Sequence, residues 1–127
     1  MLRELERPGA EKSAIAVVWS RSRTVTLRGE LDAETVLEAE RAVRAAERTC
    51  DDLVLDLSDL TFLDSAGLNL IFDTAHRVRD RGGRVTVRAT HRLVRRVLRM
   101  MFVDELVDVE PALTAADDRD GPTVLPL

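Results

Sequence analysis

Short apolar strands alternate with amphipathic helices along this sequence, and that order limits the fold more than any other feature. Residues 52–57 and 84–89 have the apolar patterns of strands, and residues 65–81 between them repeat apolar side chains at helical spacing. A strand, a helix and a second strand in this order form a parallel pair joined by a right-handed crossover. We therefore expect an α/β fold built on a mainly parallel sheet.

The remaining segments extend this unit at both ends. We expect strands at 14–19 and 24–31, a helix at 32–48, a loop at 58–64, a helix at 91–101 and a last strand or edge segment at 103–109. The first two strands are joined by a short polar turn and form an antiparallel hairpin. The sequence thus predicts one mixed, mainly parallel sheet of four to five strands packed with three or more helices.

The chain length of 127 residues fits a single domain. We assign that domain to residues 14–110, between a flexible charged leader at 1–13 and a disordered acidic tail at 111–127. No stretch approaches the roughly 20 apolar residues of a membrane helix, and the leader lacks the apolar core of a secretory signal. We therefore expect a cytoplasmic protein with no membrane partner.

The composition excludes several classes of function. Cys50 is the only cysteine, which rules out an internal disulfide framework and a cysteine-based metal site. Lys12 is the only lysine and lies in the leader, so a phosphate-binding loop with its core lysine is absent. The chain has no tyrosine, one tryptophan and three phenylalanines, too few for a platform that stacks single-stranded nucleic acid. We expect no metal and no cofactor.

Charge is distributed unevenly along the chain. Residues 76–99 hold nine arginines against Asp80, whereas residues 104–127 hold seven acids against Arg119. The spacing of the arginines in the third helix places them on one face: Arg92, Arg95, Arg96 and Arg99. Such a face could bind the phosphates of a nucleic acid. The net charge of −4 and the absence of a nucleic-acid motif favour a solvated face instead. We expect no direct nucleic-acid partner.

Functional side chains are expected where the parallel strands end. Loops that leave the carboxyl ends of parallel strands meet at one edge of the sheet. The polar candidates at that edge are acids and hydroxyls, together with one histidine: Asp32, Ser58, Asp59, Asp64, Ser65, Thr90 and His91. This set contains no obvious base, metal-ligand spacing or glycine-rich phosphate loop, so the edge is suited to recognition more than to catalysis.

The residues from Leu63 to Leu68 (LDSAGL) open the second helix and admit two interpretations. In the first, Asp64 or Ser65 caps the helix and Gly67 permits close packing. In the second, Ser65 is a presented hydroxyl, and phosphorylation there adds about −1.5 to −2 charges beside Asp64 and near Asp32. Such an addition would switch a partner interface by repulsion without melting the fold.

Three stretches of the sequence carry a resemblance to a known family. The stretch 27–32 (LRGELD) and the stretch 54–58 (VLDLS), followed by 62–68 (FLDSAGL), resemble the STAS domain of bacterial anti-anti-sigma factors. The spacing and the order of elements agree with that family over about residues 14–110. The combination of the strand end G-E-L-D with the loop F-L-D-S-A-G is specific for the fold.

The resemblance implies a partner-switching regulator that is not an enzyme. In the unphosphorylated form such a protein binds an anti-sigma factor that is a serine kinase, and thereby frees a sigma factor. Phosphorylation of the motif serine, here Ser65, ends the binding, and a serine phosphatase would restore it. The implied partner surface comprises Asp32, Ser58, Asp64, Ser65, Ala66, Gly67 and Leu68. We expect a monomer or a weak homodimer.

Two departures and two alternatives accompany this interpretation. Ala66 stands where many members have a second serine, so Ser65 is the one acceptor in the motif, and members of scaffold complexes often have threonine at the Ser65 position. A STAS scaffold module of a transporter or stress-signalling complex, without phosphoswitching, is the main alternative. A hydrolase that pairs Ser65 with His76 is disfavoured, because eleven residues of one helix separate them by about 16 Å.

Overall fold

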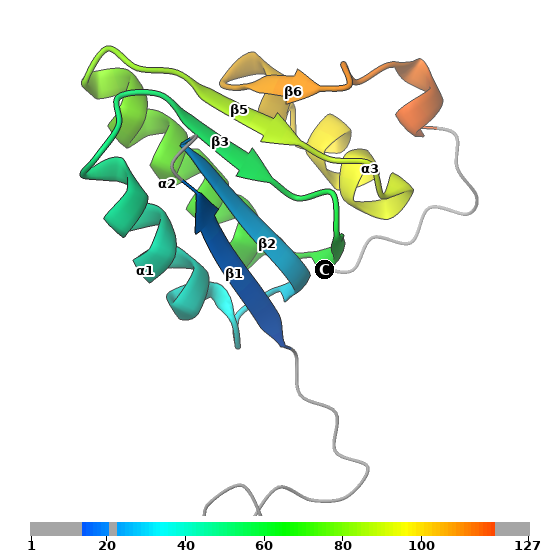
Figure 1. The fold of residues 1–127 in the computed structure, drawn as a ribbon. Helices are drawn as coiled ribbons and strands as arrows, with labels where there is room; N and C mark the ends of the chain where they lie inside the picture. The colour runs from blue at the N-terminus through cyan, green and yellow to red at the C-terminus, as the bar shows by residue number, and fades with distance from the viewer. Residues whose placement is uncertain (1–13, 21–22, 119–127) are drawn as a thin grey trace, which may run out of the picture.

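The computed structural model of the protein describes residues 14–20 and 23–118. The elements in chain order are β1 (Ile15–Ser20), β2 (Thr24–Leu31), α1 (Val36–Glu47), β3 (Leu53–Asp56), β4 (Leu60–Leu63), α2 (Ser65–Asp80), β5 (Val85–Arg88), α3 (Arg92–Met100) and β6 (Asp108–Glu110). Two 3-10 helices, Val103–Glu105 and Ala115–Asp118, flank β6. Figure 1 shows the chain along this course.

The strands form one mixed sheet in the order β1-β2-β3-β5-β6. β1 and β2 are antiparallel, and the pairs β2–β3, β3–β5 and β5–β6 are parallel. The predicted hairpin, the crossovers and the mainly parallel sheet of a single α/β domain are therefore confirmed. Within the described ranges three α-helices accompany this sheet, which has six strands and so exceeds the predicted four to five.

The additional strand is β4, which lies inside the segment 58–64 that was predicted as a loop. The chain turns after β3, with the Leu60 amide donating to the Leu57 carbonyl, and then rejoins the sheet. β3 pairs with the first half of β2, at Thr24–Thr26, and β4 pairs in parallel with the second half, at Gly29–Leu31. The loop prediction was wrong because a four-residue strand gives little periodicity, and its partner β2 lies far away in sequence.

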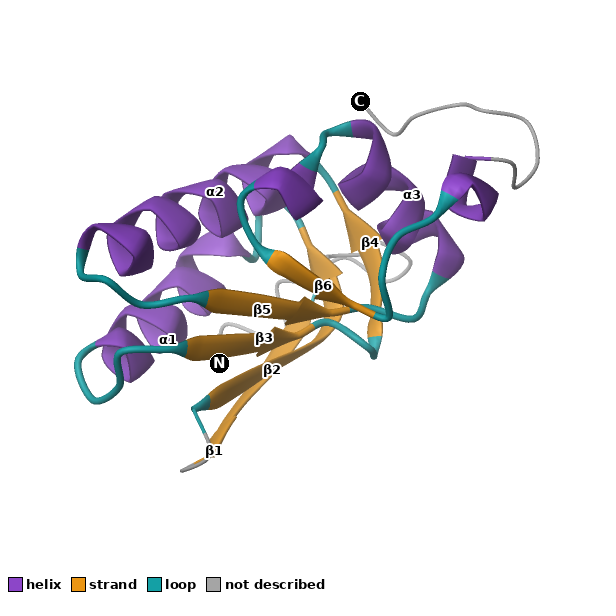
Figure 2. Cartoon of the chain, turned by 90° about the horizontal axis from the view of Figure 1, so that it is seen from above, coloured by secondary structure: helices purple, strands orange, loops and turns teal. Residues whose placement is uncertain are grey.

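The helices cover one face of the sheet. Figure 2 shows α1, α2 and α3 on the same side of the strands, and no α-helix of the described residues lies on the opposite face. Alternate residues of β2, β3 and β5 point into the layer between sheet and helices and are buried: Val25, Leu27, Leu53, Leu55, Val85 and Val87. These residues belong to the main apolar core, which Ala39, Val43, Ile71 and Val78 complete from α1 and α2.

The first helix begins later than the sequence suggests. The prediction started it at Asp32, but residues 32–35 form a turn, and α1 begins at Val36 with Thr35 as its N-cap. Leu37, the second residue of α1, is 63% exposed. The short turn is needed because the chain must leave the sheet before it can wind into a helix.

The ordered domain continues past the predicted boundary at residue 110. Residues 111–118 were assigned to the acidic tail, but Leu113 and Asp117 are buried, and Ala115–Asp118 is helical. Arg95 of α3 holds this segment by donating to the Pro111 and Ala112 carbonyls and to both Asp117 oxygens. The remainder of the predicted tail and the predicted leader at 1–13 lie outside the described residues.

The predicted solvated arginine face of α3 is wrong for two of its four residues. Arg96 is 5% exposed, and the side chain of Arg95 is 12% exposed in its contact with Asp117. Arg99 pairs with Asp118 at 3.3 Å, and Arg92 is exposed. Most of this positive charge therefore serves contacts within the chain, which weakens the case for a phosphate-gripping surface.

Candidate functional site

The end of β2 and the start of α2 meet at one point of the sheet edge. The parallel register pairs Leu31 of β2 with Leu63 of β4, and the Asp64 amide donates to the Leu31 carbonyl at 3.3 Å. The next residue of each strand, Asp32 and Asp64, therefore leaves the sheet beside the other. Ser65 follows at once as the first residue of α2, so the backbone of Asp32 lies near that of Asp64 and Ser65 at this edge.

Asp64 caps α2. Its backbone is extended, with φ −117° and ψ −166°, and its Oδ1 accepts from the Ala66 amide at 2.9 Å and the Gly67 amide at 3.2 Å. Ser65 is exposed, and its hydroxyl has no hydrogen-bond partner among the described residues. Because Asp64 alone performs the capping, the cap and the presented hydroxyl coexist, and the two interpretations of this motif do not compete.

Gly67 and Leu68 support the site from beneath. A Cβ at Gly67 would lie 2.5 Å from Leu63 Cδ1 and 2.8 Å from Leu31 Cγ, so only glycine lets α2 rest on the ends of β2 and β4. Leu68 is 6% exposed and belongs to the core. Both residues were predicted as part of a partner surface, but their burial gives them a packing role. Ala66, which is half-buried, stays at the surface beside Ser65.

Asp32 organises the turn between β2 and α1. Its half-buried carboxylate accepts from the Glu34 amide at 2.9 Å, and its carbonyl accepts from the Val36 amide at 2.9 Å. The N-cap position of the first helix is taken by Thr35 and not by Asp32. The spacing Asp-x-x-Thr is typical of a side-chain-stabilised turn and could have identified Thr35 from the sequence.

Ser58 lies apart from Ser65, in the turn between β3 and β4. Its amide donates to Asp56 Oδ1 at 3.0 Å, and its carbonyl accepts from Thr90 Oγ1 at 3.1 Å. The length of β4 separates it from Asp64. Ser58 and Thr90 thus form a neighbouring part of the same edge, next to His91, whose Nδ1 accepts from the Leu93 amide at the start of α3.

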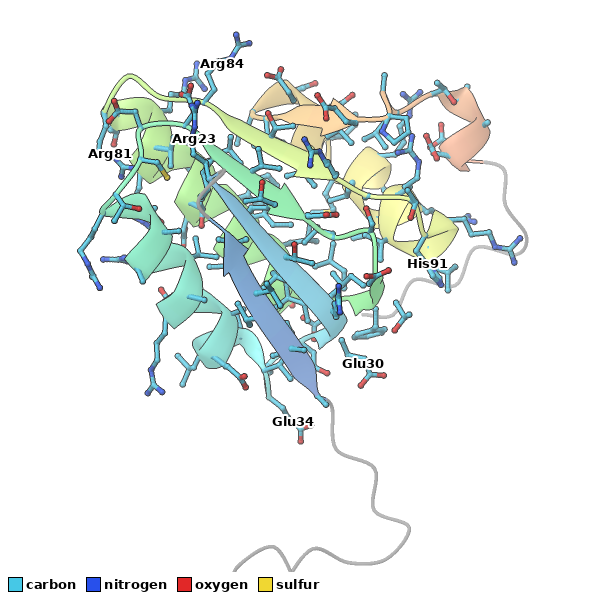
Figure 3. The ribbon with its side chains drawn as sticks, viewed as in Figure 1. Arg23, Glu30, Glu34, Arg81, Arg84 and His91 are labelled. Carbon is cyan, nitrogen blue, oxygen red and sulfur yellow. The ribbon has the colours of Figure 1, made fainter. Side chains whose placement is uncertain are left out.

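Acidic residues lie at the end of the sheet where β2 finishes. Figure 3 shows Glu30 and Glu34 at the end where β2 finishes, and Arg23, Arg81 and Arg84 at the opposite end. Glu30 and Glu34 flank Asp32 in sequence, so acids surround the turn next to Asp64 and Ser65. A phosphate added to Ser65 would therefore enter a negative environment.

Residues 14–20 and 23–118 contain neither a cluster of metal-binding side chains nor a membrane-spanning helix. No group of three or more His, Cys, Asp or Glu side chains there could hold a metal ion. No helix in the same part of the chain is long and apolar enough to cross a membrane. Ser65 and His76 both lie on α2, as predicted, so they cannot form a hydrogen-bonded pair.

Comparison with known proteins identifies the family. The model of the STAS domain matches residues 15–116. A relative from Paenibacillus polymyxa named anti-sigma F factor antagonist is 34% identical over 89 residues, which cover 67% of this chain and 74% of the relative. This chain belongs to the STAS domain family.

Solved structures agree with this assignment. An anti-sigma factor antagonist from Mycobacterium paratuberculosis is 27% identical with a TM-score of 0.67, covering 84% of this chain and 90% of that one. The anti-sigma factor antagonist SpoIIAA, in its unphosphorylated form, is 21% identical with a TM-score of 0.62, covering 87% and 100% of the two chains. Bacillus SpoIIAA in its phosphorylated form is 20% identical with a TM-score of 0.57, covering 84% of this chain and 97% of that one. The SpoIIAA structures share the fold.

Proposed function

We propose that this protein is an anti-sigma factor antagonist whose binding is switched off by phosphorylation of Ser65. In the unphosphorylated form it binds an anti-sigma factor that is a serine kinase, and the sigma factor is released. The observation that carries the proposal is the exposed Ser65 hydroxyl, which stands at the first position of α2 without a partner in the described chain. The names of the Paenibacillus and Mycobacterium relatives support it.

The geometry around Ser65 favours a switch by repulsion. Free amides at a helix N-terminus attract phosphate, but the Asp64 carboxylate already accepts from the amides of Ala66 and Gly67. A phosphate on Ser65 would have to share these donors with a negative neighbour. The added charge of about −1.5 to −2 therefore projects toward the partner, while the core beneath, at Gly67 and Leu68, is unchanged.

The partner surface follows from the same arrangement. Its exposed or half-buried members are Asp32, Asp64, Ser65 and Ala66, and Ser58 with Thr90 extends it along the sheet edge. The acids favour a partner with basic groups, and complementary charge would raise the association rate more than the affinity. Because the proposed kinase uses ATP, we place the encounter in the cytoplasm, with a serine phosphatase reversing the modification. The protein acts as a monomer or a weak homodimer.

A binding comparison tests the proposal. Immobilised wild type, Ser65→Ala and Ser65→Glu proteins are exposed to native-host lysate, and retained proteins are identified by mass spectrometry. We expect wild type and Ser65→Ala to retain a small ATP-binding kinase and Ser65→Glu to lose it. The matched control is Asn69→Glu, because Asn69 is also exposed on α2 and the substitution adds the same charge one turn away.

The scaffold alternative gives a different result in the same experiment. A STAS module without a phosphoswitch would retain the same partners in all variants, and no kinase would be among them. Equal retention of a kinase by Ser65→Glu and wild type would also contradict the proposal, since the charge at Ser65 would then have no effect.

A further inference from the structure

We propose that Thr35 is a positioning residue for the Ser65 switch, because its hydroxyl holds the turn through which Asp32 leaves β2, next to the strand β4 that leads into Asp64 and Ser65. The inference rests on the proposed function in one respect: a negative neighbour matters to Ser65 because Ser65 receives a phosphate. The placement of Asp32 by Thr35 is a property of this chain alone, and it can be measured without the kinase.

The Thr35 hydroxyl links the two sides of the point where β2 leaves the sheet. Thr35 is 4% exposed. Its Oγ1 donates to the Glu30 carbonyl at 2.7 Å and accepts from the Asp32 amide at 3.0 Å. One side chain thus bonds to the residue before Leu31 and to the residue after it, so the exit direction of the chain is fixed.

Asp32 is held by this turn next to β4. Leu31 pairs with Leu63, and the Asp64 amide bonds to the Leu31 carbonyl, so any change in the exit of β2 moves Asp32 relative to Asp64 and Ser65. The start of α1 has support of its own, because the Val36 amide donates to the Asp32 carbonyl at 2.9 Å. Loss of the Thr35 hydroxyl should therefore relax the turn locally without unfolding the helix.

A purely structural role for Thr35 predicts a different outcome from a positioning role. A buried hydroxyl that only stabilises the fold lowers the melting temperature when it is removed, as any buried threonine would. Removing a positioning hydroxyl also changes the electrostatic environment of a phosphate on Ser65, because Asp32 is then no longer held next to the end of β4. A nearby carboxylate raises the second pKa of a phosphate by disfavouring the dianion.

The test is a titration of phosphoserine installed at position 65 by genetic incorporation. The second phosphate pKa, ordinarily about 6, is followed by phosphorus NMR in the full chain. Asp32→Asn should lower this pKa relative to the parent, and Thr35→Val should lower it by at least about half as much. Glu30, Glu34 and Asp64 remain in every variant, so Asp32→Asn is the one change in the series that removes a charge.

Conservative and matched variants complete the experiment. Thr35→Ser keeps the hydroxyl and should restore the parent pKa. Thr74→Val is the matched control, since Thr74 is 0% exposed and its hydroxyl donates to the Leu70 carbonyl within α2. It should lower the melting temperature but leave the phosphate pKa unchanged. Thr35→Cys, with its weaker hydrogen bonds, should give an intermediate pKa and replaces the valine variant if that variant does not fold.

Three results would overturn the inference. An unchanged pKa in Asp32→Asn would show that Asp32 is not beside Ser65. A parent-like pKa in Thr35→Val, with Asp32→Asn shifted, would show that Thr35 does not position Asp32. An equal shift in Thr74→Val would indicate general destabilisation. Because the phosphate is installed directly, these results stand whether or not Ser65 is phosphorylated in the host.

Discussion

The two ends of α2 are built in opposite ways. At the C-terminal end, Glu47 of α1 is buried and bonds to Arg77 at 2.7 Å and to Arg81 at 3.2 Å. At the N-terminal end, Ser65 is exposed with no hydroxyl partner in the described chain, and it directly follows the capping residue Asp64. At the C-terminal end the charged side chains pair with one another within the protein. At the N-terminal end the Ser65 hydroxyl is exposed and accessible to a binding partner. The contrast indicates that α2 is fixed at its far end so that its first residue is presented in a defined place.

The largest effect is expected where packing supports the presented end. Gly67→Val should lower the free energy of unfolding by about 3 kcal/mol, because its side chain would overlap Leu63 and Leu31. Chemical denaturation measures the loss. Asn69→Val, an exposed position in the same turn, serves as the control and should cost only about 0.5 kcal/mol. An equal loss of unfolding free energy in the two variants would contradict the close-packing role of Gly67.

The fixed end should give the next largest effect. Glu47→Gln leaves Arg77 and Arg81 without their shared carboxylate and should cost about 2 kcal/mol, less than for a fully buried pair because both arginines reach solvent. Glu40→Gln removes a more exposed partner, 3.9 Å from Arg44, and should cost under about 0.5 kcal/mol. If both variants lose equally little, the ion cluster does not fix the end of α2.

The cap on the presented end contributes less. Asp64→Ala removes the acceptor for the Ala66 and Gly67 amides and should cost about 1 kcal/mol, and Asp64→Ser should retain most of that stability. Thermal unfolding of the two variants measures the difference. A serine variant as unstable as the alanine variant would contradict the capping role.

The smallest effect is a dependence on pH. Burial raises the pKa of Glu47, but hydrogen bonds and charge from Arg77 and Arg81 outweigh it and hold that pKa below its ordinary 4.5. For Asp117, burial is likewise outweighed by hydrogen bonds from Arg95 and the Thr114 amide, so its pKa lies below its ordinary 3.8. Both carboxylates therefore stabilise the fold fully above those ordinary values, and the contribution is lost as pH falls through the lowered values.

Acid titration of the unfolding free energy measures this dependence. Glu47→Gln and Asp117→Asn should each flatten the decline below about pH 4.5. A decline identical in wild type and Glu47→Gln would show that the fixed end does not depend on this carboxylate.

The sequence predicted the presented end better than the fixed end. Helical periodicity and the residues Asp64 and Ser65 locate the start of α2, because a cap is a local feature. The Glu47–Arg77 pair joins residues 30 positions apart, and Arg95 meets Asp117 across 22 positions, so no local pattern reveals either contact. Strand β4 was not predicted for the same reason, because it pairs with β2, which lies far away in the sequence.

The most direct test of the presented hydroxyl is mass spectrometry of the protein isolated from its native host, across growth conditions, with Ser65→Ala beside it. The account predicts a phosphorylated fraction in wild type, located at Ser65 by peptide analysis and absent from Ser65→Ala. Wild type that never carries phosphate at Ser65 under any condition would contradict the account and leave the scaffold alternative in its place.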